Sequence, residues 1–166
     1  ALLKKGVQHN PAIWQLSFFL GYDYFYELQD PASAAKHFQA ASVLPGAPSW
    51  LAGLAARMAV EANDPHAALE FLQRVYLKAT DEQMRESLAQ RIREVTAERD
   101  IRELEKGIIS YRDRMGKSPE MLEDLVRSGI LIRIPPEPFG GRYELSSVDG
   151  SVTSSGLRER LRVYRK

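Results

Sequence analysis

The fold class follows from two matching stretches of sequence, Asp30-Pro-Ala-Ser-Ala-Ala-Lys-His-Phe38 and Asp64-Pro-His-Ala-Ala-Leu-Glu-Phe-Leu72, which lie 34 residues apart. Because further pairs share this spacing, the sequence predicts a structural repeat of that length. The further pairs are Pro11 with Pro45, and Gly21 with Ala55 and then Ala89.

Each unit of the repeat is predicted to be a pair of antiparallel helices. Asp30 and Asp64 suit helix N-caps, where a carboxylate accepts hydrogen bonds from backbone N–H groups that lack a partner within the helix. The proline after each aspartate suits the first helical position. Apolar residues at helical spacing predict the packed faces. They are Phe18, Tyr22, Phe25, Tyr26, Ala34, Ala35, Phe38 and Ala41 in the first unit, and Trp50, Leu54, Ala55, Met58, Ala68, Leu72 and Val75 in the second.

This pattern resembles the tetratricopeptide repeat (TPR), whose period is 34 and whose consensus runs Gly or Ala, Tyr, Ala-x3-Phe and Pro. The resemblance implies a mainly α fold, a solenoid of antiparallel helix pairs, and a role in binding other proteins. Both units carry one residue more than the family norm before the aspartate. The matching residues are Gly21, Tyr24, Ala34, Phe38, Ala41 and Pro45, with a looser set of Ala55, Met58, Ala68, Leu72 and Val75.

The repeat divides the chain into segments. Asp81 is a good N-cap, and no Gly or Pro follows it until Gly107, so we expect one long helix or two nearly collinear ones that cap the array. We also expect the chain to be the carboxy-terminal part of a longer array. The expected segments are 1–10 (tail of a preceding repeat helix), 11–45 and 46–80 (repeats), 81–115 (degenerate repeat or capping helix), 116–155 (small α+β cap) and 156–166 (basic tail).

The α+β cap has sequence signals of its own. A short helix is predicted from Ser118-Pro119 to Gly129, and Asp149-Gly150 predicts the turn of a β-hairpin. Residues 107–154 resemble the segment that follows the long helix in the major pseudopilin of type II secretion systems. The resemblance rests on Tyr111, Gly116-x-x-Pro119, Leu125-Val126 and Pro136-Glu-Pro-Phe-Gly-Gly-Arg-Tyr143. It implies the local helix-then-hairpin fold and raises a bacterial cell-envelope role, in pilus, secretion or polysaccharide assembly.

Composition and charge narrow the function classes. With 23 Lys and Arg against 22 Asp and Glu, the formal net charge is +1, so a nucleic-acid partner is not expected. The absence of cysteine excludes disulfides and thiolate metal sites. His9, His37 and His66 have no second ligand at metal spacing, and no run of about 18 apolar residues predicts a membrane span. We therefore expect no enzyme, no cofactor and no metal ion.

The candidate binding residues follow from aligning the repeats, which places the first helix of each unit on a groove. The predicted groove residues are Gln15, Phe18, Tyr22, Tyr26, Ala52, Ala56, Ala59, Gln90 and Arg93. Such a groove can hold an extended or helical peptide. Alternatively, Phe18 and Tyr26 pack on an upstream repeat.

Two other functions stay open at this point. A repeat end can stack on a second copy of the chain and build a scaffold. The tail can contact an anionic surface or nucleic acid through Arg158, Arg160, Arg162, Arg165 and Lys166, although a solvated tail is the alternative. The compartment stays open between the bacterial cytoplasm and the periplasm or cell envelope.

Overall fold

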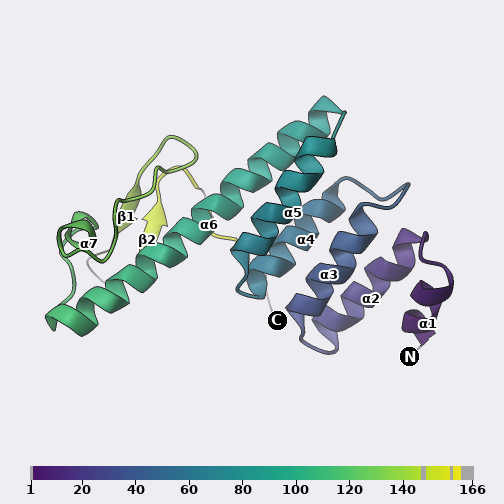
Figure 1. The fold of residues 1–166 in the computed structure, drawn as a ribbon, viewed down its shortest axis with the longest axis horizontal. Helices are drawn as coiled ribbons and strands as arrows, with labels where there is room; N and C mark the ends of the chain where they lie inside the picture. Colours follow the sequence, from purple (N-terminus) through teal and green to yellow (C-terminus); the bar gives the residue numbers. More distant parts are fainter. Residues whose placement is uncertain (1, 147–148, 158, 162–166) are drawn as a thin grey trace. The chain divides into compact units, whose positions relative to one another are not determined.

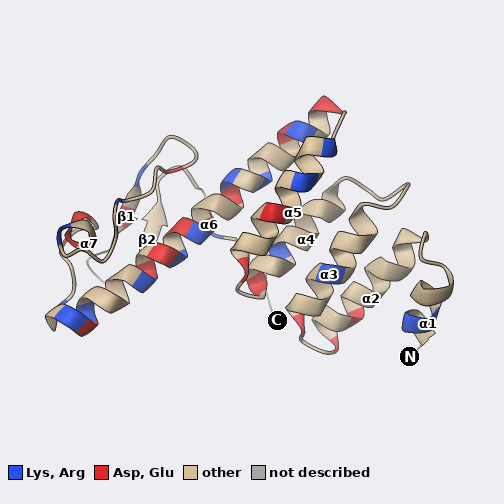
Figure 2. Ribbon diagram, viewed as in Figure 1, with Lys and Arg blue, Asp and Glu red and all other residues tan. Residues whose placement is uncertain are grey.

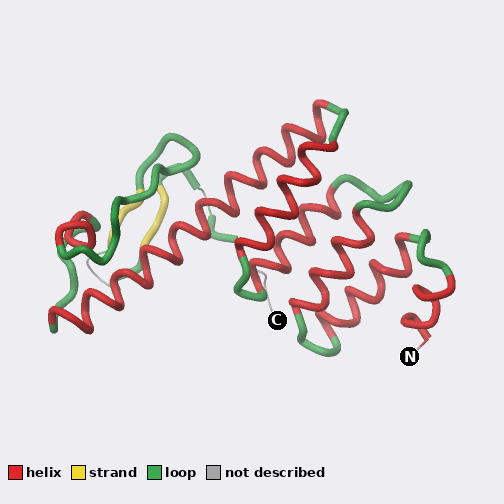
Figure 3. The backbone as a smooth tube through the Cα atoms, in the orientation of Figure 1, coloured by secondary structure: helices red, strands yellow, loops and turns green. Residues whose placement is uncertain are grey.

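The computed structural model describes residues 2–146, 149–157 and 159–161. They form two compact units, which are described separately below. The first unit runs to Val95 and includes Leu161, and the second runs from Thr96 to Arg160. The chain is mainly helical, with one small antiparallel sheet (Figures 1 and 3). The elements of the described residues are α1 (Leu2–His9), α2 (Trp14–Tyr26), α3 (Pro31–Ser42), α4 (Trp50–Glu61), α5 (Pro65–Lys78), α6 (Glu82–Met115), α7 (Glu123–Arg127), β1 (Tyr143–Leu145) and β2 (Val152–Ser154).

Three helices begin at an aspartate cap, as the sequence predicts. Asp30 Oδ1 accepts a hydrogen bond from the Ser33 backbone N–H at 2.9 Å, and Asp64 Oδ1 accepts one from Ala67 at 2.9 Å. Asp81 caps α6 in the same way at 2.7 Å. Proline occupies the first helical position of both α3 and α5. These contacts satisfy backbone donors that a helix leaves without partners at its start.

The turns before α3 and α5 share one backbone geometry at the spacing of the sequence repeat. Gln29 has a φ of 50° and Asn63 a φ of 62°, in the left-handed region that few residues other than glycine adopt. The next backbone N–H, that of Asp30 or Asp64, donates to a carbonyl in the last turn of the preceding helix, at 2.8 Å and 2.9 Å respectively. The turn geometry therefore repeats after 34 residues, as the sequence does.

The core of the first unit lies between helices that pack in chain order, α1 on α2 and so on to α5 (Figure 1). Gly21 of α2 lies so close to α3 that a Cβ atom there would sit 2.8 Å from the Phe38 ring. The absence of a side chain at Gly21 is therefore what allows these helices to approach. The predicted core residues Ala34, Ala35, Phe38, Ala41, Ala55, Met58, Ala68 and Leu72 are all buried, and α6 adds Leu88 and Val95.

Helix α6 is one continuous helix of 34 residues, which decides between the two forms that the sequence allowed. Charged residues occur along its whole length (Figure 2). Ion pairs one turn apart, such as Lys106 with Glu103 at 3.0 Å, add to helix stability. Within the described residues, no helix is long and apolar enough to cross a membrane.

The second unit contains the predicted hairpin. Strands β1 and β2 pair antiparallel, with Tyr143 opposite Ser154 and Leu145 opposite Val152. The Asp149 side chain stabilises the turn into β2, because its carboxylate accepts hydrogen bonds from the Ser151 N–H at 3.1 Å and the Ser151 hydroxyl at 2.8 Å. Tyr143 and Val152 of the hairpin are part of the core of this unit, together with Ile101, Leu104, Ile108, Leu122 and Leu125.

Helix α7 is shorter than predicted, since it begins at Glu123 and not near Ser118. The Asp124 carboxylate accepts hydrogen bonds from the backbone N–H groups of Glu120 at 3.0 Å and Met121 at 3.2 Å, which holds a turn ahead of the helix. Gly129 follows the helix with a φ of 71°. The predicted end of this helix is therefore confirmed, and its predicted start is wrong.

Candidate functional site

The exposed face of α2 is aromatic. Phe19, Tyr22 and Tyr26 follow one another at intervals of three and four residues, so they share one face of the helix. Each is about half exposed, between 46% and 58%. The Tyr22 and Tyr26 rings lie 4.3 Å apart between centroids. Asp23 is the single charged residue of α2, which appears almost free of charge in Figure 2.

Trp50, at the start of α4, extends this aromatic face. Its side chain is 54% exposed. The half-buried Phe18 joins it to α2, with its ring 5.9 Å from the Trp50 ring and 5.4 Å from the Phe19 ring. Phe18 also contacts the buried Phe38 ring at 5.5 Å, which fixes its position. We call the exposed residues Phe19, Tyr22, Tyr26 and Trp50 the aromatic face.

A shallow hollow of about 240 Å³ lies beside Trp50, between α4 and α6. It is lined by Gly53, Arg57 and Arg91 among others. The Arg91 side chain crosses α4 at Gly53, where a Cβ atom would sit 3.4 Å from its Nε. Arg91 also pairs with Glu94. Two guanidinium groups therefore lie next to the aromatic face.

Several of the predicted groove residues lie on the surface, among them Tyr22 and Tyr26, which the helical spacing also placed on a packed face. Gln15, Tyr22 and Tyr26 are exposed on α2, and Gln90 is exposed on α6. Arg93 is also exposed, and its Nη2 donates to Gln90 Oε1 at 2.9 Å. Phe18 is the exception on α2, because it packs mainly on its neighbours.

The groove prediction for α4 is wrong, because this helix is covered on more of its circumference than expected, with both Ala55 and Ala56 buried. Ala56 and its neighbours Ala52 and Ala59 are buried at 0%, 2% and 4% exposure, so they cannot line a groove. Trp50, which was predicted to pack inside, is on the surface. The physical reason is that α4 packs on both α3 and α5, and its small alanines allow both to come close.

The alignment of repeats also missed Phe19, Arg57 and Arg91. A signal for Phe19 was present, since it precedes Tyr22 by three residues and Tyr26 by seven, the spacing of one helical face. Arg57 and Arg91 carried no such signal, because single arginines on helices are common surface residues.

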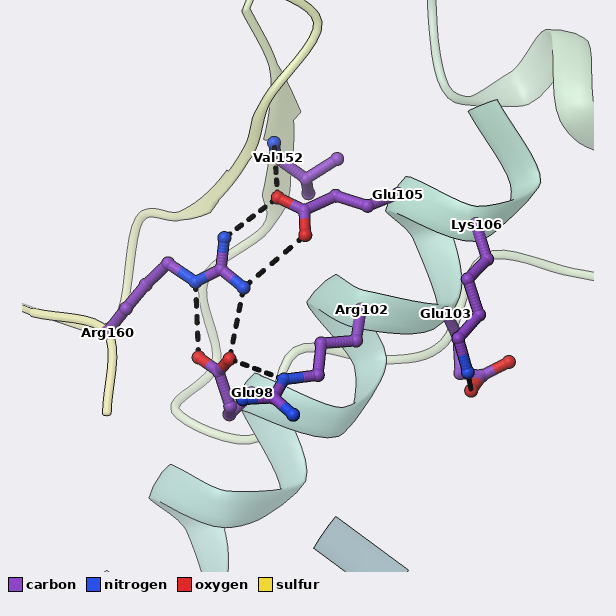
Figure 4. A network of polar contacts seen from close by, with 7 residues as sticks. All are labelled: Glu98, Arg102, Glu103, Glu105, Lys106, Val152 and Arg160. Carbon is purple, nitrogen blue, oxygen red and sulfur yellow. Dashed lines mark hydrogen bonds and ion pairs between the residues drawn. The ribbon is translucent and has the colours of Figure 1, made fainter. Parts of the chain in front are cut away.

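The predicted basic tail is described only in part. Arg158, Arg162, Arg165 and Lys166 lie outside the described residues. Arg160 belongs to the second unit, where its guanidinium bonds to two carboxylates (Figure 4). Its Nη2 donates to Glu98 Oε1 at 3.0 Å, and its Nη1 donates to Glu105 Oε1 at 2.8 Å. Arg160 thus stabilises the fold through internal ion pairs.

The other buried carboxylates of the second unit are also engaged. Asp100 accepts hydrogen bonds from the neighbouring Arg99 at 2.7 Å and from the Tyr143 hydroxyl at 3.0 Å. Burial, and then the charge of Asp100, raise the pKa of Tyr143 well above its ordinary value. Glu137 accepts from two backbone N–H groups, at 2.8 Å and 2.7 Å, and from Ser154 Oγ at 2.8 Å. Across the described ranges, no buried side-chain nitrogen or oxygen lacks a partner, and no His, Asp and Glu side chains gather as metal ligands.

Comparison with family models, curated proteins and solved structures finds no match to this chain. The function of the aromatic face is therefore argued from its side chains. Rings and guanidinium groups on one exposed surface can bind a partner by burial of apolar area and by stacking.

Proposed function

We propose that the chain is a non-catalytic protein–protein interaction module of the TPR type, whose partner docks a peptide segment on the aromatic face. The observation that carries this proposal is the set of half-exposed rings Phe19, Tyr22 and Tyr26 on α2 and Trp50 on α4, which the Phe18 ring connects. Trp and Tyr are the residues that most often dominate binding energy at protein interfaces, together with Arg. Arg57 and Arg91 line a hollow beside Trp50.

The TPR assignment is supported by the recurrence of the Asp-Pro cap and of the turn before it. Both features repeat at the spacing that the sequence predicts. The consecutive packing of α1 to α5 also fits a solenoid, in which each repeat contacts its neighbours in the chain. The resemblance of residues 107–154 to the major pseudopilin extends the proposal to an adaptor in a bacterial cell-envelope assembly.

The test uses peptides selected on the protein from a displayed random library. Their affinities are then measured by fluorescence anisotropy for the wild type and for the double variant Tyr22→Ala with Tyr26→Ala. We expect a loss of at least about tenfold, equal to about 1.4 kcal/mol, because two neighbouring exposed rings are removed. The matched control is Ile132→Ala in the second unit, an apolar residue that is 97% exposed.

Equal affinity of the selected peptides for the double variant and the wild type would refute the aromatic face as the docking site. Circular dichroism of both variants checks that the helices are retained, so that a loss of affinity reports on the surface itself.

Self-association is a second candidate function, and one observation favours it. None of the α1 residues is buried, and Leu2 exposes 86% of its side chain. A second copy that packs on α1 would cover this surface. Light scattering over a wide concentration range tests the idea, because a constant monomer mass excludes it.

A further inference from the structure

A second surface of the first unit is a groove of about 600 Å³ between α3, α5 and the start of α6. Its lining differs in kind from the aromatic face. Phe71 forms the buried base, while Val75 and Met84 are half buried and Val43 is 64% exposed. A groove of this volume is large enough for several side chains of a ligand.

The charged residues of this groove are mainly cations. Lys36 comes from α3, and Arg74 and Lys78 come from one face of α5, four residues apart. All three are exposed, and none forms an ion pair with another described residue. Among the described lining residues, Asp81 has the one carboxylate, and this carboxylate accepts a hydrogen bond from the Met84 backbone N–H at the start of α6. The groove therefore combines an apolar base with a positive edge.

We propose that this groove binds an acidic peptide segment of a partner protein, in which apolar side chains alternate with Asp or Glu. The apolar side chains contact Phe71, Val75 and Met84, and the carboxylates pair with the cations at the edge. Arg74 can hold a carboxylate through two parallel hydrogen bonds. The groove thus adds a second docking surface, with different chemistry, to the one on α2 and α4.

The remaining lining residues favour a peptide over other anionic ligands. Gln39, Ser42 and Thr80 line the same groove and can exchange hydrogen bonds with a peptide backbone. A nucleic acid would instead require an array of phosphate contacts, and three cations beside an apolar base supply few of them.

The experiment measures binding of a short labelled peptide of Leu and Glu residues by fluorescence anisotropy. Two matched peptides replace Glu by Gln or by Lys. We expect the Glu peptide to bind at least about tenfold more tightly than the Gln peptide, and its affinity to fall as salt is raised, since exposed charges are screened. The Lys peptide is expected not to bind.

Two variants locate the site. Arg74→Glu combined with Lys78→Glu reverses the positive edge and should weaken the Glu peptide by at least about tenfold. Val43→Asp should weaken it by placing a carboxylate in the apolar part. The control is Arg133→Glu, which also replaces a cation by a carboxylate but at an exposed site in the second unit. It should leave the affinity for the Glu peptide unchanged.

Equal binding of the Glu and Gln peptides would overturn the proposal, as would unchanged affinity in the double variant. A third outcome would also overturn the proposal, in favour of a membrane surface. In that outcome the wild type binds anionic lipid vesicles but not the Glu peptide, and the variant Arg74→Glu with Lys78→Glu does not bind the vesicles. The double variant Tyr22→Ala with Tyr26→Ala should bind the Glu peptide as the wild type does, so this test and that of the aromatic face can fail independently.

Discussion

Arg160 holds the carboxylate of Glu98 through two hydrogen bonds, from Nε at 3.1 Å and from Nη2 at 3.0 Å, although 62 residues separate them in the sequence. Glu98 is 2% exposed, and Arg102 donates to the same carboxylate at 2.8 Å. Burial alone would lower the pKa of Arg160, but its contacts with Glu98 and Glu105 outweigh burial and raise it. The segment after β2 is thus tied to α6 by a paired, buried charge.

Replacement of Arg160 by Ala should destabilise the protein by about 2 kcal/mol, measured by urea denaturation. Removal of one partner from a buried pair is costly because the other charge stays in a poor environment. We expect a smaller loss of stability than is usual for a buried pair, because Arg102 still contacts Glu98 and because Arg160 is partly exposed.

The control for this prediction is Arg142→Ala. Arg142 also pairs with a glutamate, Glu144 at 2.7 Å, but on the protein surface, where ion pairs contribute little. We expect no measurable change in its denaturation midpoint. If both variants lose the same stability, the ion pair of Arg160 is not a special feature of the fold.

The close approach of α2 and α3 gives a second prediction. Gly21→Ala would place a Cβ atom 2.8 Å from the buried Phe38 ring, so we expect a loss of about 1 kcal/mol despite the better helix propensity of Ala. Gly53→Ala meets only the flexible Arg91 side chain at 3.4 Å and should gain about 0.5 kcal/mol. Thermal unfolding by circular dichroism measures both. A stabilised Gly21→Ala variant would contradict the close packing at this position.

The sequence was sufficient for features that depend on local chemistry. Asp30 and Asp64 cap helices because a carboxylate before a proline suits that position, whatever packs on the helix later. The turn at Asp149-Gly150 and the end of α7 at Gly129 are local in the same sense. These elements could therefore be predicted from a few neighbouring residues.

The candidate site was harder to predict because it depends on which faces of a helix its neighbours cover. Alanine fits a buried or an exposed position, so Ala56 gave no indication that its face of α4 is covered. On α4, Trp50 is exposed instead, and Arg57 is half buried. Likewise, nothing local to Arg160 pointed to Glu98, since a pair so distant in sequence is created only by the tertiary fold.

The hydrogen bond between the Tyr143 hydroxyl and Asp100, 3.0 Å long, predicts how stability responds to high pH. Burial and the Asp100 charge keep the phenol protonated in the folded chain, above its ordinary pKa of 10.0. The unfolded chain therefore releases this proton first as the pH rises. The stabilisation is complete below pH 10.0 and is lost as the pH rises through the higher pKa of the folded state.

The variant Tyr143→Phe removes both the hydrogen bond and the titration. At neutral pH we expect it to be less stable by about 1 to 2 kcal/mol, since the buried Asp100 loses a donor. Above pH 10.0 the free energy of unfolding of the wild type should fall faster than that of the variant, by up to about 1.4 kcal/mol per pH unit, so the two curves converge. Urea denaturation of both proteins across this range measures the difference, in which the titration of other groups cancels. Parallel curves would mean that Tyr143 ionises equally easily in the folded and unfolded states, which its burial beside a carboxylate should prevent.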